Sequence, residues 1–264
     1  NMQKMPIIFI GHGSPMNAIE TNTYSESWKK IWNSIPEPRA ILIFSAHWIT
    51  PWSTQISTSD HPPMIYDMGG FPDELYRVQY PAKGSQSIAK EIKEHIENTT
   101  SIKIEEHPTR GLDHGSWSIL LHLFPHANIP VISMSIDYLA SPESLFNLGA
   151  SLASLREQWI LIVGSGNTVH NLMMIDWSNT IEYPWAIEFD KKIETLVKNN
   201  DITSLFWFEE WGNISKLAHP TYDHLLPIFP LLWATESDDA VQFLTPDIVM
   251  GSLSMRSIVW NSSK

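Results

Sequence analysis

Cysteine is absent from all 264 residues of the sequence. Thiolate metal sites, disulfides and iron–sulfur clusters are thereby excluded, so any bound metal must take nitrogen and oxygen ligands. The absence also fits a reducing compartment, and we expect a cytoplasmic protein. No apolar run approaches the roughly 18 residues of a membrane span, and residues 1–5 lead into a short strand without a signal-peptide core. Asn1, ahead of Met2, is interpreted as a remnant of recombinant expression.

Positive charge is also scarce. Lysine and arginine number 17 against 29 aspartate and glutamate residues, which gives a formal net charge of −12. No basic stripe interrupts this balance, so we expect neither nucleic acid nor a membrane surface as a partner. Three catalytic motifs are missing too: the Gly-x-Ser-x-Gly elbow of α/β hydrolases, the Gly-x-x-x-x-Gly-Lys-[Ser/Thr] phosphate loop and the His-Glu-x-x-His helix of metalloproteases.

Short apolar runs, rich in β-branched residues, alternate with longer amphipathic segments. This alternation predicts an α/β fold with a central mixed, largely parallel sheet flanked by helices. We expect one catalytic domain over residues 1–264, because the candidate site residues described below span most of the chain. The expected strands are 6–10, 40–45, 130–136 and 159–164, and the expected helices are 87–98, 116–124, 142–156 and 183–199.

Four histidines lie near the ends of strands or in loops. His12 follows the first expected strand by two residues, His47 follows the second by two, and His170 follows the fourth by six. Because ligand sites gather beyond the carboxyl ends of parallel strands, these three should meet at one rim, joined by His224 from the C-terminal third. Converging imidazoles with an open coordination position favour a catalytic divalent metal.

Other motifs leave alternatives open. Asp113 and His114 precede an expected helix, so they are either an acid/base or substrate-binding pair, or an ordinary helix N-cap region. Gly164 and Gly166 follow a strand, but the third glycine of a dinucleotide fingerprint is missing, which disfavours a nucleotide site. The loop 59–84, rich in proline, glycine and aromatics, is expected to be a lid or a substrate-facing insertion.

The remaining histidines are given no chemical role. His122 and His126 are spaced four apart, as metal ligands on a helix can be, but a surface or half-buried position is the favoured interpretation. Solvated or loop positions are expected for the others: His61, His95, His107 and His219.

Eight ordered motifs resemble the DOPA 4,5-extradiol dioxygenase-like family. This family belongs to the class III extradiol ring-cleavage dioxygenases, in the protocatechuate-dioxygenase β-subunit superfamily. The resemblance covers essentially the whole chain. Its motifs are GHGSPMNAIE (11–20), SAHW (45–48), YDMGGFP (66–72), GLDHGSW (111–117), GSGNTVHNL (164–172), YPWA (183–186), PTYDHLLP (220–227) and MGSLSM (250–255).

The resemblance implies a ligand set and roles. His12, His47 and His224 match the metal-ligand positions, whereas His170 matches an acid/base that can also act as a fourth ligand. His114 matches a second active-site histidine near the substrate. One divalent metal per chain is implied, Fe(II) for ring cleavage, with Zn(II) as the ion some members carry.

The expected function is therefore extradiol cleavage of a small catechol, DOPA-like or a related aromatic diol. Both atoms of O₂ are inserted into the substrate next to the diol. The alternative is a zinc-dependent hydrolase, or a zinc-bound member of the same fold with another substrate, because an all-histidine site lacks the carboxylate of the usual iron triad. The substrate-binding candidates are Ser14, Asp113 and Tyr222, with Arg77 and Arg110 as further candidates for a substrate carboxylate. The oligomeric state is left open.

Overall fold

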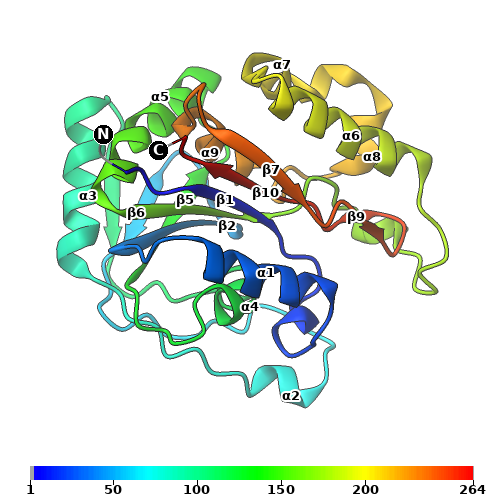
Figure 1. Cartoon of the computed structure of the whole chain (residues 1–264), viewed down its shortest axis with the longest axis horizontal. Helices are drawn as coiled ribbons and strands as arrows, with labels where there is room; N and C mark the ends of the chain where they lie inside the picture. Colours follow the sequence, from blue (N-terminus) through cyan, green and yellow to red (C-terminus); the bar gives the residue numbers. More distant parts are fainter. Residues whose placement is uncertain (1–2, 264) are drawn as a thin grey trace.

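An eight-stranded sheet forms the centre of the molecule in the computed structural model, which describes residues 3–263 (Figure 1). Its strand order is β4-β3-β5-β2-β6-β1-β10-β7, and the four central strands β5, β2, β6 and β1 run parallel. β10 and β7 add antiparallel pairs at one edge, and β3 pairs antiparallel with β5 near the other. The strands are β1 (Ile7–Gly11), β2 (Ala40–Thr50), β3 (Thr54–Ser57), β4 (Ile104–His107), β5 (Val131–Asp137), β6 (Ile160–Gly166), β7 (Ala240–Leu244) and β10 (Ser257–Asn261), with β8 (Ile248–Val249) and β9 (Leu253–Ser254) forming a separate pair.

Helices cover both faces of the sheet (Figure 1). Helices α1 and α4 lie on one face, and α3, α5, α6 and α9 lie on the other. The α-helices are α1 (Thr23–Ser34), α2 (Asp73–Tyr76), α3 (Gln86–Thr99), α4 (His114–Leu123), α5 (Pro142–Leu152), α6 (Pro184–Lys198), α7 (Ile202–Phe206), α8 (Asn213–Ala218) and α9 (Ile228–Ala234). Short 3₁₀ helices are η1 (Pro15–Ala18), η2 (Ala153–Gln158), η3 (Leu172–Met174) and η4 (Phe208–Trp211).

The central strands bury side chains on both faces because helices cover both. In β1, Ile7 and Phe9 enter the core beneath α3, α5, α6 and α9, while Ile8 and Ile10 enter the core beneath α1 and α4. This two-residue alternation follows from the pleat of a strand. Strands buried on both faces read as continuous apolar runs, which is why the sequence revealed them.

The predicted fold class is confirmed, and the predicted strands and helices agree with the observed ones to within a few residues, with two exceptions. The helix expected over 142–156 ends as α5 at Leu152 and continues as the 3₁₀ helix η2. The second strand does not stop at Ser45 but runs to Thr50. Asn1 lies outside the described residues. Within residues 3–263, no helix is long and apolar enough to cross a membrane.

The extension of β2 bears on the site. Its pairing with β5 shifts register between Phe44 and Ile49. Such an irregularity bends a strand and redirects the side chains beside it. His47 lies in this irregular stretch, so it is part of an irregular strand end rather than of the loop that the sequence predicted.

Candidate metal centre

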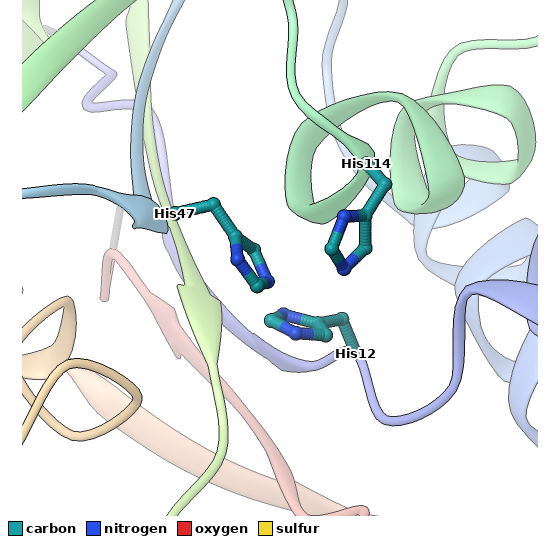
Figure 2. A group of neighbouring side chains, drawn as sticks. All are labelled: His12, His47 and His114. Carbon is teal, nitrogen blue, oxygen red and sulfur yellow. The ribbon is translucent and has the colours of Figure 1, made fainter. Parts of the chain in front are cut away.

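Three histidine rings converge beyond the carboxyl ends of the central strands (Figure 2). His12 follows β1, His47 lies in the irregular end of β2, and His114 is the first residue of α4. One ring nitrogen from each lies within 4.8 Å of the others. The ring centroids of His47 and His114 are 4.0 Å apart, and those of His12 and His47 are 5.3 Å apart. These three side chains could together hold one metal ion.

Two further predicted residues lie beside this group. The His224 ring lies 5.2 Å from His12 and 5.1 Å from His47, measured between ring centroids. His170 stacks on His224 at 3.4 Å with the ring planes nearly parallel. The structure therefore brings together all five predicted histidines. The three histidines with ring nitrogens within 4.8 Å of one another, however, are His12, His47 and His114. The resemblance implied His224, not His114, as the third ligand.

The hydrogen bonds around His12 define which ring nitrogen faces the centre. The Ser165 hydroxyl on β6 donates to the Gly115 carbonyl at 2.6 Å. With its hydrogen used there, the hydroxyl accepts from Nδ1 of His12 at 2.9 Å. Nε2 of His12 then carries the free lone pair. An outer partner that fixes the tautomer in this way is typical of metal-binding histidines.

Carboxylates play the same part for two other rings. Nδ1 of His224 donates to Asp223 at 2.5 Å. Nδ1 of His114 donates to Asp67 at 2.9 Å, and the backbone N–H of His114 donates to the same oxygen at 2.8 Å. Each ring thus has Nε2 as its unprotonated nitrogen.

His47 provides the observation that bears most directly on a metal. Its Nε2 is buried and has no hydrogen-bond partner among the described residues. A buried polar atom without a partner costs about 1–3 kcal/mol, so a group that binds it is expected. The neighbouring Gly115 permits this packing, because a Cβ there would lie 2.8 Å from Cδ2 of the His47 ring. A divalent metal with imidazole ligands fits this environment.

Electrostatics favour the neutral form of three of these rings, those of His12, His47 and His170. Burial, with the other histidines nearby, lowers the pKa of His12 well below its usual value and lowers the pKa of His47 to about 3. Burial likewise lowers the pKa of His170 to about 2, with His224 adding to the effect. Although burial opposes it, the hydrogen bond from His224 lowers the pKa of Asp223. Neutral imidazoles are the form that binds metal.

Asp113 is the N-cap of α4, which is one of the two roles that the sequence left open for it. It is buried, and Oδ1 accepts the Ser116 N–H at 3.1 Å as the N-cap of α4. The Ser45 hydroxyl donates to Oδ1 at 2.7 Å, and Arg110 donates to Oδ2 at 2.9 Å. Burial raises the pKa of Asp113, and the charge of Asp67 adds to this. These contacts occupy the carboxylate that we expected to bind substrate.

The other substrate-binding candidates are more scattered. Ser14 accepts the Met16 N–H as the N-cap of η1, two residues from His12. Tyr222 is partly exposed and lines a separate cavity of ≈ 320 Å³ that none of the five histidines lines. Arg110 lies 4.8 Å above the Trp48 ring, next to His47, whereas Arg77 is exposed at the end of α2.

The loop 59–84 does reach the site, through Asp67. The sequence gave this residue no role, because its partner His114 lies 47 positions away and no local pattern joins them. Ser165 was missed for a similar reason, since a serine inside a buried strand is common. A polar residue inside the motif YDMGGFP was the one signal available for Asp67.

Of the minor expectations, the one for His219 holds in part and the one for His122 was wrong. His219 lies in the loop after α8, as expected, but it is only 1% exposed, and its Nε2 pairs with the Thr168 carbonyl at 2.7 Å. His122 is buried rather than at the surface and bonds the Asn17 carbonyl at 2.8 Å. His126 and His61 are exposed, and His95 and His107 are half-buried.

Comparison with known proteins extends these observations. Residues 6–252 match the family described as the catalytic LigB subunit of aromatic ring-opening dioxygenase. The chain is 37% identical over 262 residues to the 4,5-DOPA dioxygenase extradiol of Escherichia coli K12, covering 97% of this chain and 94% of the relative. It is 33% identical over 241 residues to the protein of that name from Beta vulgaris, covering 89% of each.

A solved structure agrees as well. The crystal structure of an uncharacterized protein from Escherichia coli K12 shares the fold with a TM-score of 0.82 and 32% identity, over 97% of this chain and 99% of that one. The family match covers nearly all of the chain, and the histidines converge as a metal centre requires. The chain therefore belongs to the LigB family of aromatic ring-opening dioxygenases, which are metal-dependent oxidoreductases.

Proposed function

We propose that this protein is an extradiol dioxygenase that inserts both atoms of O₂ into a small catechol next to the diol. The observation that carries the proposal is the buried, unpartnered Nε2 of His47 at the centre of a histidine cluster. The relatives named 4,5-DOPA dioxygenase extradiol support a DOPA-like substrate. The cytoplasmic location expected from the sequence and the assignment of residues 1–264 to one catalytic domain stay predictions.

The proposed ligands are His12, His47 and His224, with Fe(II) as the ion for ring cleavage. The outer partners Ser165 and Asp223 support His12 and His224, because each leaves Nε2 free for a metal. Bound Fe(II) would supply positions for the diol and for O₂ and would lower the pKa of a catechol hydroxyl. Zn(II) is the other ion that an all-histidine site accepts.

The remaining histidines have proton-transfer roles in this proposal. His114 points its distal ring edge at His12 and His47 (Figure 2), so it faces the space where a diol would lie. His170 stacks on the proposed ligand His224, with the two ring centroids 3.4 Å apart. Each can take a proton from a hydroxyl and return it later, as general acid/base catalysis requires. Ser14 and Tyr222 remain the proposed contacts to the substrate, because each lies two residues from a proposed ligand, His12 or His224. Asp113, expected in the same role, caps α4.

The first experiment is anaerobic loading of the protein with Fe(II), followed by oxygen-electrode traces with a panel of catechols that includes DOPA. We expect oxygen uptake that tracks a ring-cleavage product in the wild type and in the exposed-histidine control His61→Ala. His170→Ala should retain metal and lose about 10²–10⁴-fold in rate, the usual contribution of a general acid/base. Activity that persists without oxygen would overturn the proposal.

The all-nitrogen donor set specifically favours one other candidate function, a zinc-dependent hydrolase. Loading with Zn(II) distinguishes the two, because a hydrolase would act under nitrogen and a ring-cleaving dioxygenase would not. The metal content of two variants tests which histidines are the ligands. His224→Ala should lose the metal, and His114→Ala should retain it. The reverse result would make His12, His47 and His114 the ligands.

A further inference from the structure

Asp67 is the one carboxylate that the long loop 59–84 brings against the histidine cluster. Its Oδ1 accepts two hydrogen bonds from His114, one from the backbone N–H at 2.8 Å and one from Nδ1 at 2.9 Å. Its Oδ2 lies 3.8 Å from Nδ1 of His47. The same carboxylate thus faces two rings whose centroids are 4.0 Å apart.

The chain places Asp67 through a short parallel contact between two loops. Met64 bridges Leu112, with the Ile65 N–H donating to the Leu112 carbonyl and the Leu112 N–H donating to the Pro63 carbonyl, both at 2.8 Å. The Trp117 indole N–H also donates to the Ile65 carbonyl at 3.0 Å. The segment just before Asp67 is therefore fixed beside the segment just before His114.

Hydrogen-bond chemistry then determines the state of the His114 ring. A backbone N–H can only donate, so Oδ1 of Asp67 is an acceptor, and the ring nitrogen beside the same oxygen must donate as well. The neutral ring carries one hydrogen. With that hydrogen on Nδ1, the lone pair lies on Nε2, at the ring edge directed toward His12 and His47 (Figure 2).

We propose that Asp67 is a positioning residue for His114: it fixes the Nδ1–H tautomer, aims the Nε2 lone pair at the substrate space and compensates the charge of the protonated ring. This inference rests on the proposed function, in which His114 exchanges a proton with a catechol hydroxyl. The proton moves from the hydroxyl oxygen to Nε2 and back, while Asp67 stays ionised throughout. The loop 59–84 therefore supplies part of the acid/base machinery rather than a cover alone.

A purely structural interpretation of Asp67 would make it a cap for α4. However, Asp113 already caps this helix, through the Ser116 N–H. Asparagine also separates the two interpretations, because its Oδ1 can accept both hydrogen bonds without carrying a charge. Asp67→Asn should therefore preserve the fold and tautomer but lose charge compensation, whereas Asp67→Ala should lose both.

The decisive readout is the histidine ring tautomer, measured by NMR on the metal-free, ¹⁵N-histidine-labelled protein at alkaline pH. The His114 signal is the one missing from His114→Gln. We expect Nδ1–H in the wild type and in Asp67→Asn, and Nε2–H in Asp67→Ala. The control Asp60→Asn alters another aspartate of the same loop, which accepts the Gln86 N–H and touches no histidine of the cluster. It should match the wild type.

Turnover of the Fe(II)-loaded variants provides the second readout. Asp67→Asn should lower kcat about 10–100-fold at unchanged metal content, as outer-shell changes typically do, while Asp60→Asn should not. A wild-type His114 with Nε2–H, or an Nδ1–H that persists in Asp67→Ala, would overturn the proposal. If the wild type shows no ring cleavage, the proposed function fails, and the NMR result still decides how Asp67 positions His114.

Discussion

Buried polar groups have hydrogen-bond partners at one end of the central parallel strands and lack them at the other. At the amino ends, Arg156 is completely buried, and its guanidinium donates to the Met5 and Ala234 carbonyls and to both oxygens of Asp239. At the carboxyl ends, Nε2 of His47 and Nε of Arg110 are buried without a partner among the described residues.

This contrast indicates which end of the strands stabilises the fold and which end binds a ligand. A buried ion pair whose hydrogen bonds are all made holds segments together, here the start of β1, the end of η2 and the turn after α9. Buried polar atoms without hydrogen-bond partners lower the stability of the empty protein, and a bound ligand would satisfy them. The amino end is therefore expected to control stability, and the carboxyl end to control binding.

The largest expected effect is on metal binding. His47→Ala removes a ligand of the proposed centre, so metal content should fall to background. The free energy of unfolding of the metal-free protein should change little, because the lost nitrogen has no partner to lose. Metal analysis and urea unfolding measure both quantities. A large loss of stability in the metal-free variant would contradict the division between the two ends.

At the amino end, Arg156→Met should lower the stability of the protein but leave metal binding unchanged. The substitution leaves Asp239 buried without its partner, and breaking such a pair costs about 3–5 kcal/mol. Denaturant unfolding should show this loss, while the folded fraction binds metal with unchanged affinity. The double variant Arg156→Met/Asp239→Leu, in which no charge is left uncompensated, should recover part of the stability.

His219 should make stability depend on pH. Burial lowers the pKa of His219 from 6.5 to about 4, so the unfolded chain binds a proton here at a higher pH than the folded one. Stability should therefore fall as pH decreases from 6.5 toward 4, by up to roughly 3 kcal/mol from this group. His219→Gln, which keeps a donor for the Thr168 carbonyl, should flatten that slope in unfolding experiments at several pH values.

Ser165→Ala should have the smallest effect. It removes the acceptor that fixes the His12 tautomer but keeps the ligand itself, so metal affinity should fall about 10–100-fold. Competition with a chelator of known affinity measures this change. Ser118→Ala is a suitable control, because the hydroxyl of that buried serine has no hydrogen-bond partner within residues 3–263. Equal metal affinities in the two variants would show that metal binding does not depend on the hydrogen bond between His12 and Ser165.

The sequence predicted what depends on local pattern. Continuous apolar runs identified β1, β2, β5 and β6. The positions of His12, His47 and His170 after such runs led us to expect them near one another, and their rings do gather with that of His224. The irregularity in β2 was not predictable, because a register shift depends on pairing with β5, whose paired residues lie 87–90 positions further along the chain. The role of Asp67 was not predictable for the same reason, since it depends on a hydrogen bond to a residue 47 positions away.

The position of β1 has a consequence for how this protein is made. β1 is synthesised before the other described strands of the sheet, yet both its neighbours come late: β6 is at residues 160–166 and β10 at 257–261. Until then both edges of β1 lack hydrogen-bond partners, and such edges invite pairing with other chains. Because His12 follows this strand, a growing chain has this proposed ligand long before the sheet that holds it. We therefore expect metal to bind late in synthesis, and chaperones that shield β1 should raise the yield of metal-loaded protein.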